Sequence, residues 1–220
     1  MRTIEKGAEP TSLTAHREAQ HSDYGNLSAG AKDELRDSLV REQRGLCCYC
    51  MSRICPDRKS MKIEHWQSQK HHESEQLSYR NLLGSCLGGH GQPPSKQHCD
   101  TKKGDKTLKW NPAEPANRIE SLVRFDPDGT IHAEGDDAEF HRQLDDVLGL
   151  NVPKLRNNRQ SVITAIEHWW RGKMLIPDQV ERDRLVQNKR SRYVNGDGDL
   201  PQYCQVVVHW LDKRLARPTT

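Results

Sequence analysis

The spacing of the cysteines is the strongest chemical signal in this 220-residue sequence. Six of the seven cysteines fall between positions 47 and 99, and two residues separate Cys47 from Cys50. Two thiolates at that spacing can bind one zinc ion from a tight turn. Cys86 and Cys99 are the candidates for a second pair, because the segment between them is rich in glycine and proline and can fold back to the same metal. Three residues remain open as replacements for one ligand: Cys55, His90 and His98.

The alternative for this cluster is a set of free thiols. An odd number of cysteines, after an opening MRTIEKGAEP that lacks the apolar stretch of a signal peptide, favours metal over disulfides and predicts a cytoplasmic protein. We expect Cys48 and Cys204 to be small core residues.

Mean hydropathy is -0.95, and no run of about 20 apolar residues could span a bilayer. The sequence therefore excludes an integral membrane protein.

A second cluster places an acid beside a histidine. The segment Lys62-Ile63-Glu64-His65-Trp66 predicts a short strand that ends at the Glu64-His65 pair. A carboxylate is a hard ligand suited to magnesium or manganese. A histidine beside it can take a proton from an attacking water.

Two later segments extend this pattern. Asn81, in SYRNLL, could hold the histidine ring or help to bind metal. Asp100 directly follows the zinc-ligand candidate Cys99, so it would be rigidly placed. Lys103 lies one helical turn beyond Asp100, where it could meet a phosphate.

The ordered set Cys-x-x-Cys, Glu-His, Tyr-x-Asn-Leu, Cys and Cys-Asp-x-x-Lys resembles the HNH endonucleases that carry a four-cysteine zinc site. The resemblance implies an α+β fold with a small zinc-stapled ββα-metal core and an appended, mostly helical C-terminal region. It also implies roles for nine residues: His65 as general base, Glu64 and Asp100 as ligands of a catalytic Mg²⁺ or Mn²⁺, Asn81 as the middle residue of the motif, Lys103 as a phosphate contact, and Cys47, Cys50, Cys86 and Cys99 as ligands of a structural Zn²⁺. The sequence departs from that family at Asp100, where His or Asn is common, and in the long interval between Cys86 and Cys99.

Further segments resemble the PtuB family, the HNH subunits of Septu anti-phage systems and of related retron systems. They include the opening Met-Arg-x-Ile-x-Lys-Gly-x-Glu-Pro, Ile-Glu-His-Trp and His-Cys-Asp-x-Lys-Lys-Gly. In the C-terminal half only a few positions match, among them Leu-Gly-Leu-Asn, Leu155 and Arg159. This resemblance implies a nuclease effector of phage defence that acts on nucleic acid with a PtuA-like ABC- or SMC-type ATPase. It also implies association with a retron reverse transcriptase and its RNA–DNA product.

The charge pattern fits a second function from another class. Residues 46–112 carry 11 basic and 6 acidic side chains, a net charge of +5, and residues 151–220 carry 13 and 7, a net charge of +6. Residues 113–150 between them carry 3 and 10, a net charge of -7. Two basic blocks would equally serve a zinc-containing nucleic-acid-binding adaptor without catalysis. A binding module, however, has no need of the Glu64-His65 pair.

The sequence predicts some of the helices and strands that must position these residues. Ser28 predicts the N-cap of a helix over 29–44, with Leu35 and Leu39 on one face. Residues 1–26 show no clear periodicity, so we expect a polar arm or an irregular lead-in there. Residues 119–134 predict a hairpin around DPDG. We expect helices over 137–150, 154–172 and 177–192, and a final helix over 203–215 for which the run VVV leaves a strand as the alternative.

The predicted organisation has three parts. These are an N-terminal arm (1–28), a zinc-stabilised HNH domain (29–112) and a hairpin with a helical, partner-docking region (113–220). The proline-rich segment NPAEPAN and the change in charge sign place the second boundary.

Overall fold

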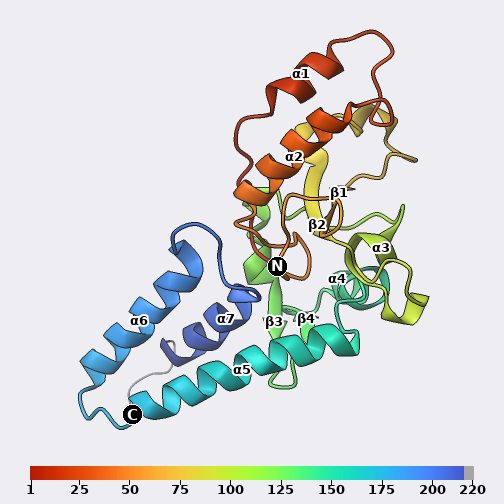
Figure 1. Ribbon diagram of the computed structural model, residues 1–220. Helices are drawn as coiled ribbons and strands as arrows, with labels where there is room; N and C mark the ends of the chain where they lie inside the picture. Colours follow the sequence, from red (N-terminus) through yellow and green to blue (C-terminus); the bar gives the residue numbers. More distant parts are fainter. Residues whose placement is uncertain (216–220) are drawn as a thin grey trace.

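The computed structural model describes residues 1–215, which form an α+β fold with two separate antiparallel two-stranded sheets (Figure 1). The predicted α+β class is therefore confirmed. Within this part of the chain, no helix combines the length and the apolar composition needed to cross a bilayer.

The N-terminal segment is more ordered than its sequence suggested. Helix α1 (Thr11–Arg17) follows Pro10, and α2 (Ala29–Glu42) packs against α1. Met1, Ile4 and Leu13 are buried, so the expectation of a polar arm without regular structure was wrong. Seven residues make about two helical turns, and one buried leucine in two turns gives no periodicity to detect.

Helix α2 confirms the prediction made for this segment. The Ser28 side chain accepts a hydrogen bond from the Ala31 backbone N–H, and Leu35 and Leu39 are fully buried. The helix ends at Glu42, two residues earlier than expected, and Gly45 then turns the chain with φ +73°.

The predicted nuclease region contains a strand, a second strand and a helix in that order. Strand β1 (Met61–His65) pairs antiparallel with β2 (Leu82–Cys86), with Met61 opposite Cys86 and His65 opposite Leu82. Helix α3 (Cys99–Lys103) packs against β2. The remainder of residues 46–112 is loop with short 3₁₀ turns at Glu73–Glu75, Tyr79–Asn81 and Pro94–Lys96.

The predicted hairpin is present but shorter. Strand β3 (Val123–Phe125) pairs antiparallel with β4 (Ile131–Ala133), and Gly129 in the turn has φ +82°. A Cβ atom at position 129 would lie 2.1 Å from the Arg156 carbonyl oxygen, so the turn requires glycine there. Residues Pro115–Asn117 and Ile119–Leu122, ahead of β3, are 3₁₀ turns rather than strand.

Helices make up most of the rest. Helix α4 (Ala138–Arg142) continues into a π-helical turn (Gln143–Val147), and α5 (Pro153–Lys173), α6 (Gln179–Asn195) and α7 (Cys204–Leu215) follow. Helix α7 packs on both α5 and α6 (Figure 1). Val206, Val207 and Val208 are all buried in α7, so the helix reading of VVV was right and the strand alternative was wrong.

The core does not break at the predicted boundary near residue 115. One cluster of buried side chains runs from Met51 and Leu83 to Ile163 and Leu211. A smaller cluster lies between α1, α2 and β2 and includes Leu13, Leu35 and Leu82. The cysteine-rich region and the C-terminal helices are therefore packed on each other.

Candidate metal centre and adjacent polar site

Four cysteines from three parts of the fold meet at one point. Cys47 and Cys50 lie in the turn after α2, Cys86 ends β2, and Cys99 begins α3. Their sulfur atoms all lie within 4.8 Å of one another. The Cys47–Cys99 distance is 3.8 Å and the Cys50–Cys86 distance is 3.7 Å. Four thiolates at the Zn–S bond length, arranged as a tetrahedron, have sulfurs about 3.8 Å apart, so this set fits a closed zinc site.

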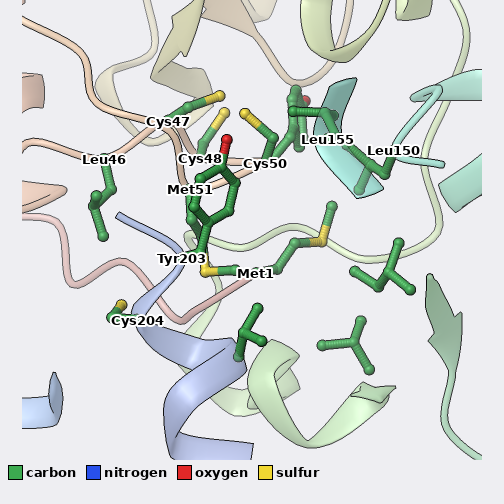
Figure 2. Close-up of a cluster of buried hydrophobic side chains, with 14 of the residues drawn as sticks. Met1, Leu46, Cys47, Cys48, Cys50, Met51, Leu150, Leu155, Tyr203 and Cys204 are labelled. Carbon is green, nitrogen blue, oxygen red and sulfur yellow. The ribbon is translucent and has the colours of Figure 1, made fainter. Parts of the chain in front are cut away.

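The turn that carries the first pair is built by backbone hydrogen bonds. The Met51 N–H donates to the Cys47 carbonyl, and the Cys47 N–H donates to the Ser52 carbonyl. Figure 2 shows Cys47 and Cys50 beside a layer of buried side chains that includes Met1, Met51 and Tyr203. The N-terminus and the start of α7 thus close one side of the cysteine cluster.

The other candidate ligands fall into two groups. Cys55 and His90 are exposed and lie outside the cluster. His98 is buried, with Nδ1 3.3 Å from the Cys99 sulfur and 3.9 Å from the Cys86 sulfur, close enough for a hydrogen bond to a thiolate. Cys48 and Cys204 are buried outside the four-cysteine set, as expected of core residues.

The four thiols of the cluster differ in acidity. Burial alone would raise the pKa of Cys47, but hydrogen bonds with Cys48, Cys50, Cys86 and Cys99 bring it well below the usual thiol value, and the pKa of Cys50 falls to about 6. Hydrogen bonds with Cys47 and Cys50 raise the pKa of Cys86, and burial raises the pKa of Cys99, so without a metal the four sulfurs do not ionise together. Thiolate is the form that binds zinc. Free thiols in a buried, low-dielectric site would gain nothing from this convergence of four sulfurs, so the geometry favours the metal over the free-thiol alternative.

A buried charge cluster lies next to the cysteines. Glu64 and Lys103 are 2% and 1% exposed, and the Lys103 ammonium lies 2.8 Å from Glu64 Oε1. The Tyr49 hydroxyl donates to the same oxygen at 2.7 Å. Glu64 also hydrogen-bonds with Asp100, and Asp100 lies 3.2 Å from the Lys62 ammonium. Strand β1 and helix α3 thus bring together the two acids that the sequence predicted as metal ligands.

The two carboxyl groups differ in how readily they take up a proton. Burial and the adjacent Asp100 raise the pKa of Glu64 well above its usual range. Burial opposes ionisation of Asp100 as well, but the hydrogen bond from Glu64 and the charge of Lys62 keep its pKa below the usual value. Two carboxyl groups in contact are a site where a divalent cation can take the place of the proton.

His65 ends β1 with one ring nitrogen fixed. Its Nε2 lies 3.0 Å from the Gln76 carbonyl oxygen, which can only accept, so Nε2 carries the proton and Nδ1 has the lone pair. The exposed Gln69 amide donates to Nδ1 at 3.3 Å, and the Tyr24 ring packs edge-on against the imidazole. Burial lowers the pKa of His65 to about 4, so the ring is neutral at neutral pH and able to accept a proton.

No family model and no curated protein matches this chain.

Asn81 occupies a different place from the ones the sequence left open. Its side-chain amide accepts from the Gln67 N–H at 2.7 Å and donates to the carbonyls of Gln67 and Glu75. These bonds tie the start of β2 to the loop that carries Gln76, the partner of His65. Asn81 thus positions the histidine through the loop and touches neither the ring nor the carboxylates.

Lys103 also differs from its expected role. The ammonium donates to Glu64 and, at 2.9 Å, to the His65 carbonyl, and it is enclosed by protein. In this structure Lys103 neutralises the acid pair instead of presenting a charge to an incoming phosphate. Tyr49, Lys62 and Gln76 complete the site and were missed. Only Tyr49 carried a signal, as the large residue inside the CCYC turn.

A basic groove runs beside α3. Its lining includes Lys102, Lys106 and Arg142, together with His71 and one acid, Asp105. Lys103 also borders the groove, but its side chain is only 1% exposed, so Lys102, Lys106 and Arg142 supply the positive charge of the groove surface.

Proposed function

We propose that this chain is a metal-dependent endonuclease of the HNH type that hydrolyses phosphodiester bonds in nucleic acid. The observation that supports it most is the state of His65. The ring is buried, neutral and hydrogen-bonded at Nε2. His65 directly follows Glu64 in β1, within electrostatic range of Asp100, in a strand–strand–helix unit that also carries the four cysteines. A packing role alone would not require a neutral imidazole at the residue after Glu64 and within electrostatic range of Asp100.

The roles of the residues follow from this geometry. His65 Nδ1 accepts a proton from the attacking water in place of the hydrogen bond from Gln69. Glu64 and Asp100 would hold Mg²⁺ or Mn²⁺, which when bound supplies charge stabilisation for the phosphate oxygens. Tyr49 and Lys103 fix the Glu64 carboxyl, and Asn81 fixes the loop that orients His65. The four cysteines, with Zn²⁺, would lock β2 and α3 in register.

The groove beside α3 fits the path of the nucleic-acid backbone. Lys102, Lys106 and Arg142 line it, and α3 carries Asp100 at its start. Surface cations of this kind supply affinity without sequence information. Substitution of Lys106 and Arg142 by Gln should weaken substrate binding and flatten its salt dependence, while single-turnover cleavage at saturating substrate persists.

The decisive experiment is cleavage of a panel of single- and double-stranded DNA and RNA with Mg²⁺ or Mn²⁺. Loss of a general base typically lowers the rate about 10²- to 10⁴-fold, and His65→Ala should show this loss with its zinc content unchanged. His90→Ala, at an exposed histidine outside the site, is the matched control. Equal cleavage by the wild type and by His65→Ala would refute the assignment.

One observation favours the second candidate, a zinc-containing nucleic-acid-binding adaptor without catalysis. Lys62 and Lys103 already neutralise the acid pair, so this cluster is electrostatically complete without a cation. An adaptor would bind nucleic acid with the salt dependence of backbone contacts, bind no Mn²⁺ at the acid pair and leave every substrate uncut. Paramagnetic broadening by Mn²⁺ that is lost in Asp100→Asn would exclude this candidate.

The resemblance to the PtuB family extends the proposal to phage defence with a PtuA-like ATPase. Among the large apolar side chains of residues 1–215, three are exposed, and they lie in or next to the connection between α5 and α6: Met174, Leu175 and Val180. Apolar groups gathered at one exposed turn are typical of a contact surface. Co-purification with the ATPase that is lost in Leu175→Glu, and not in Lys106→Glu, would support docking through the C-terminal region.

A further inference from the structure

A large cavity of the described chain lies away from the acid pair. It measures about 840 Å³ and is bordered by the N-terminal segment, the end of α2, the 3₁₀ turns before β3, and helices α6 and α7. Pockets that bind small molecules commonly fall between about 300 and 1,000 Å³. Tyr24, which contacts His65, precedes α2, whereas the cavity lies at the C-terminal end of that helix. The 14 residues of α2 span about 20 Å, so this is a separate site.

Arginines dominate the charge of this cavity. Five of them line it: Arg2, Arg41, Arg44, Arg118 and Arg190. Arg190 is paired with Asp212 through two hydrogen bonds. None of the other four makes an ion pair with a carboxylate of residues 1–215.

Three of the four acids that line the cavity already have partners within the protein. Glu42 pairs with Lys6 at 3.0 Å, and Asp212 pairs with Arg190. Glu120 accepts from the backbone N–H and the hydroxyl of Thr3. Glu5 is the remaining acid of the lining. The cavity therefore has an excess of positive charge that the described side chains do not neutralise.

Two of the arginines are held in a specific backbone conformation. Arg44 has φ +55° and Arg118 has φ +43°, a left-handed region that non-glycine residues enter at a cost in free energy. The Arg118 carbonyl accepts from both the N–H and the hydroxyl of Ser121, which fixes the turn. The Arg44 guanidinium is fixed by the carbonyls of Gly196 and Gly198. These contacts fix the backbone at Arg118 and the guanidinium of Arg44 at the edge of the cavity before any ligand binds.

The remaining lining suits a nucleoside rather than a bare ion. Asn195 and Gln205 offer amides, and Ile4, Val194 and Val208 offer apolar surface. Guanidinium groups bind phosphate through paired N–H donors. We propose that this cavity binds a polyphosphate anion of the size and charge of a nucleoside triphosphate. This site is independent of the proposed nuclease function.

Calorimetric titration of the whole chain with ATP and with inorganic tripolyphosphate tests the proposal. Both should bind and compete with each other, and ATP should bind more tightly because its nucleoside contacts the amides and apolar surface. Arg41→Gln and Arg118→Gln should each weaken binding about tenfold, since each removes one charge-assisted contact. Both residues are exposed, so neither change should unfold the chain. Arg171→Gln, at an exposed arginine of α5 outside the cavity, is the matched control.

Three results would overturn the proposal. The first is no binding of either probe. The second is equal binding by the wild type and by the double variant Arg41→Gln/Arg118→Gln. The third is binding of a single-stranded oligonucleotide that the double variant loses and that neither ATP nor tripolyphosphate displaces, because the cavity would then be part of a nucleic-acid path. His65→Ala should bind ATP as the wild type does, so failure of the nuclease proposal would leave this result unchanged.

Discussion

Replacement of Lys103 by Met tests the buried charge cluster most directly. The Lys103 ammonium lies 2.8 Å from Glu64 Oε1 and 2.9 Å from the His65 carbonyl, and both charged side chains are at most 2% exposed. Removing one partner of a buried pair costs about 3–5 kcal/mol, because the other charge stays buried and unpaired. Glu64 can take up a proton in response, since burial and Asp100 already raise its pKa. We therefore expect a loss of about 3 kcal/mol, at the lower end of that range.

Urea denaturation of zinc-loaded protein measures this loss. With a slope of about 2 kcal/mol/M, the unfolding midpoint of Lys103→Met should fall by about 1.5 M. Lys106→Met, at an exposed lysine three residues away, should change the free energy of unfolding by less than about 0.5 kcal/mol. Adding Glu64→Gln to Lys103→Met should cost less than the sum of the single changes, because the two side chains are coupled.

A small effect would refute the reasoning. If Lys103→Met costs less than about 1 kcal/mol, the pair behaves as a solvent-screened surface ion pair. Lys103 would then be accessible, and the sequence-based role as a phosphate contact would stand again. Additive effects of Glu64→Gln and Lys103→Met on the free energy of unfolding would likewise indicate that the two side chains do not interact strongly.

Three other predictions concern the metal, the histidine and the first long helix. Mass spectrometry under native conditions should find one Zn²⁺ per chain. Cys99→Ser should lose both the Zn²⁺ and the cooperative unfolding transition. Cys204→Ala should retain the Zn²⁺, because the Cys204 thiol is buried outside the cluster. Burial lowers the pKa of His65 to about 4, so the folded chain resists a protonation that the unfolded chain undergoes near 6.5 and loses stability as pH falls. Between pH 7.5 and 5.5, the wild type should lose about 1 kcal/mol more than His65→Gln in urea titrations, and equal losses would contradict the assigned ring state. Ser28→Ala should cost about 1 kcal/mol by thermal unfolding, because the Ala31 N–H loses its cap, and no change would mean that water replaces the hydroxyl.

Local spacing in the sequence determined several parts of this protein. The cap at Ser28 and the leucines four residues apart predict α2, the DPDG turn predicts the β3–β4 hairpin, and Cys-x-x-Cys predicts the tight turn that carries Cys47 and Cys50. Each of these features depends on residues within a few positions of one another. Hydrogen bonds and side-chain faces over such short distances follow from the order of the residues alone.

Tertiary structure decided the features that join distant segments. The pairing of β1 with β2 and the return of α3 bring Cys86 and Cys99 to Cys47 and Cys50, across as many as 52 positions. The same packing encloses Lys103, which no local pattern distinguishes from an exposed lysine. It also directs Asn81 to a loop rather than to the histidine. Burial and the choice of partner depend on what the rest of the chain places nearby. The sequence could therefore identify candidate site residues, but it could not predict their contacts.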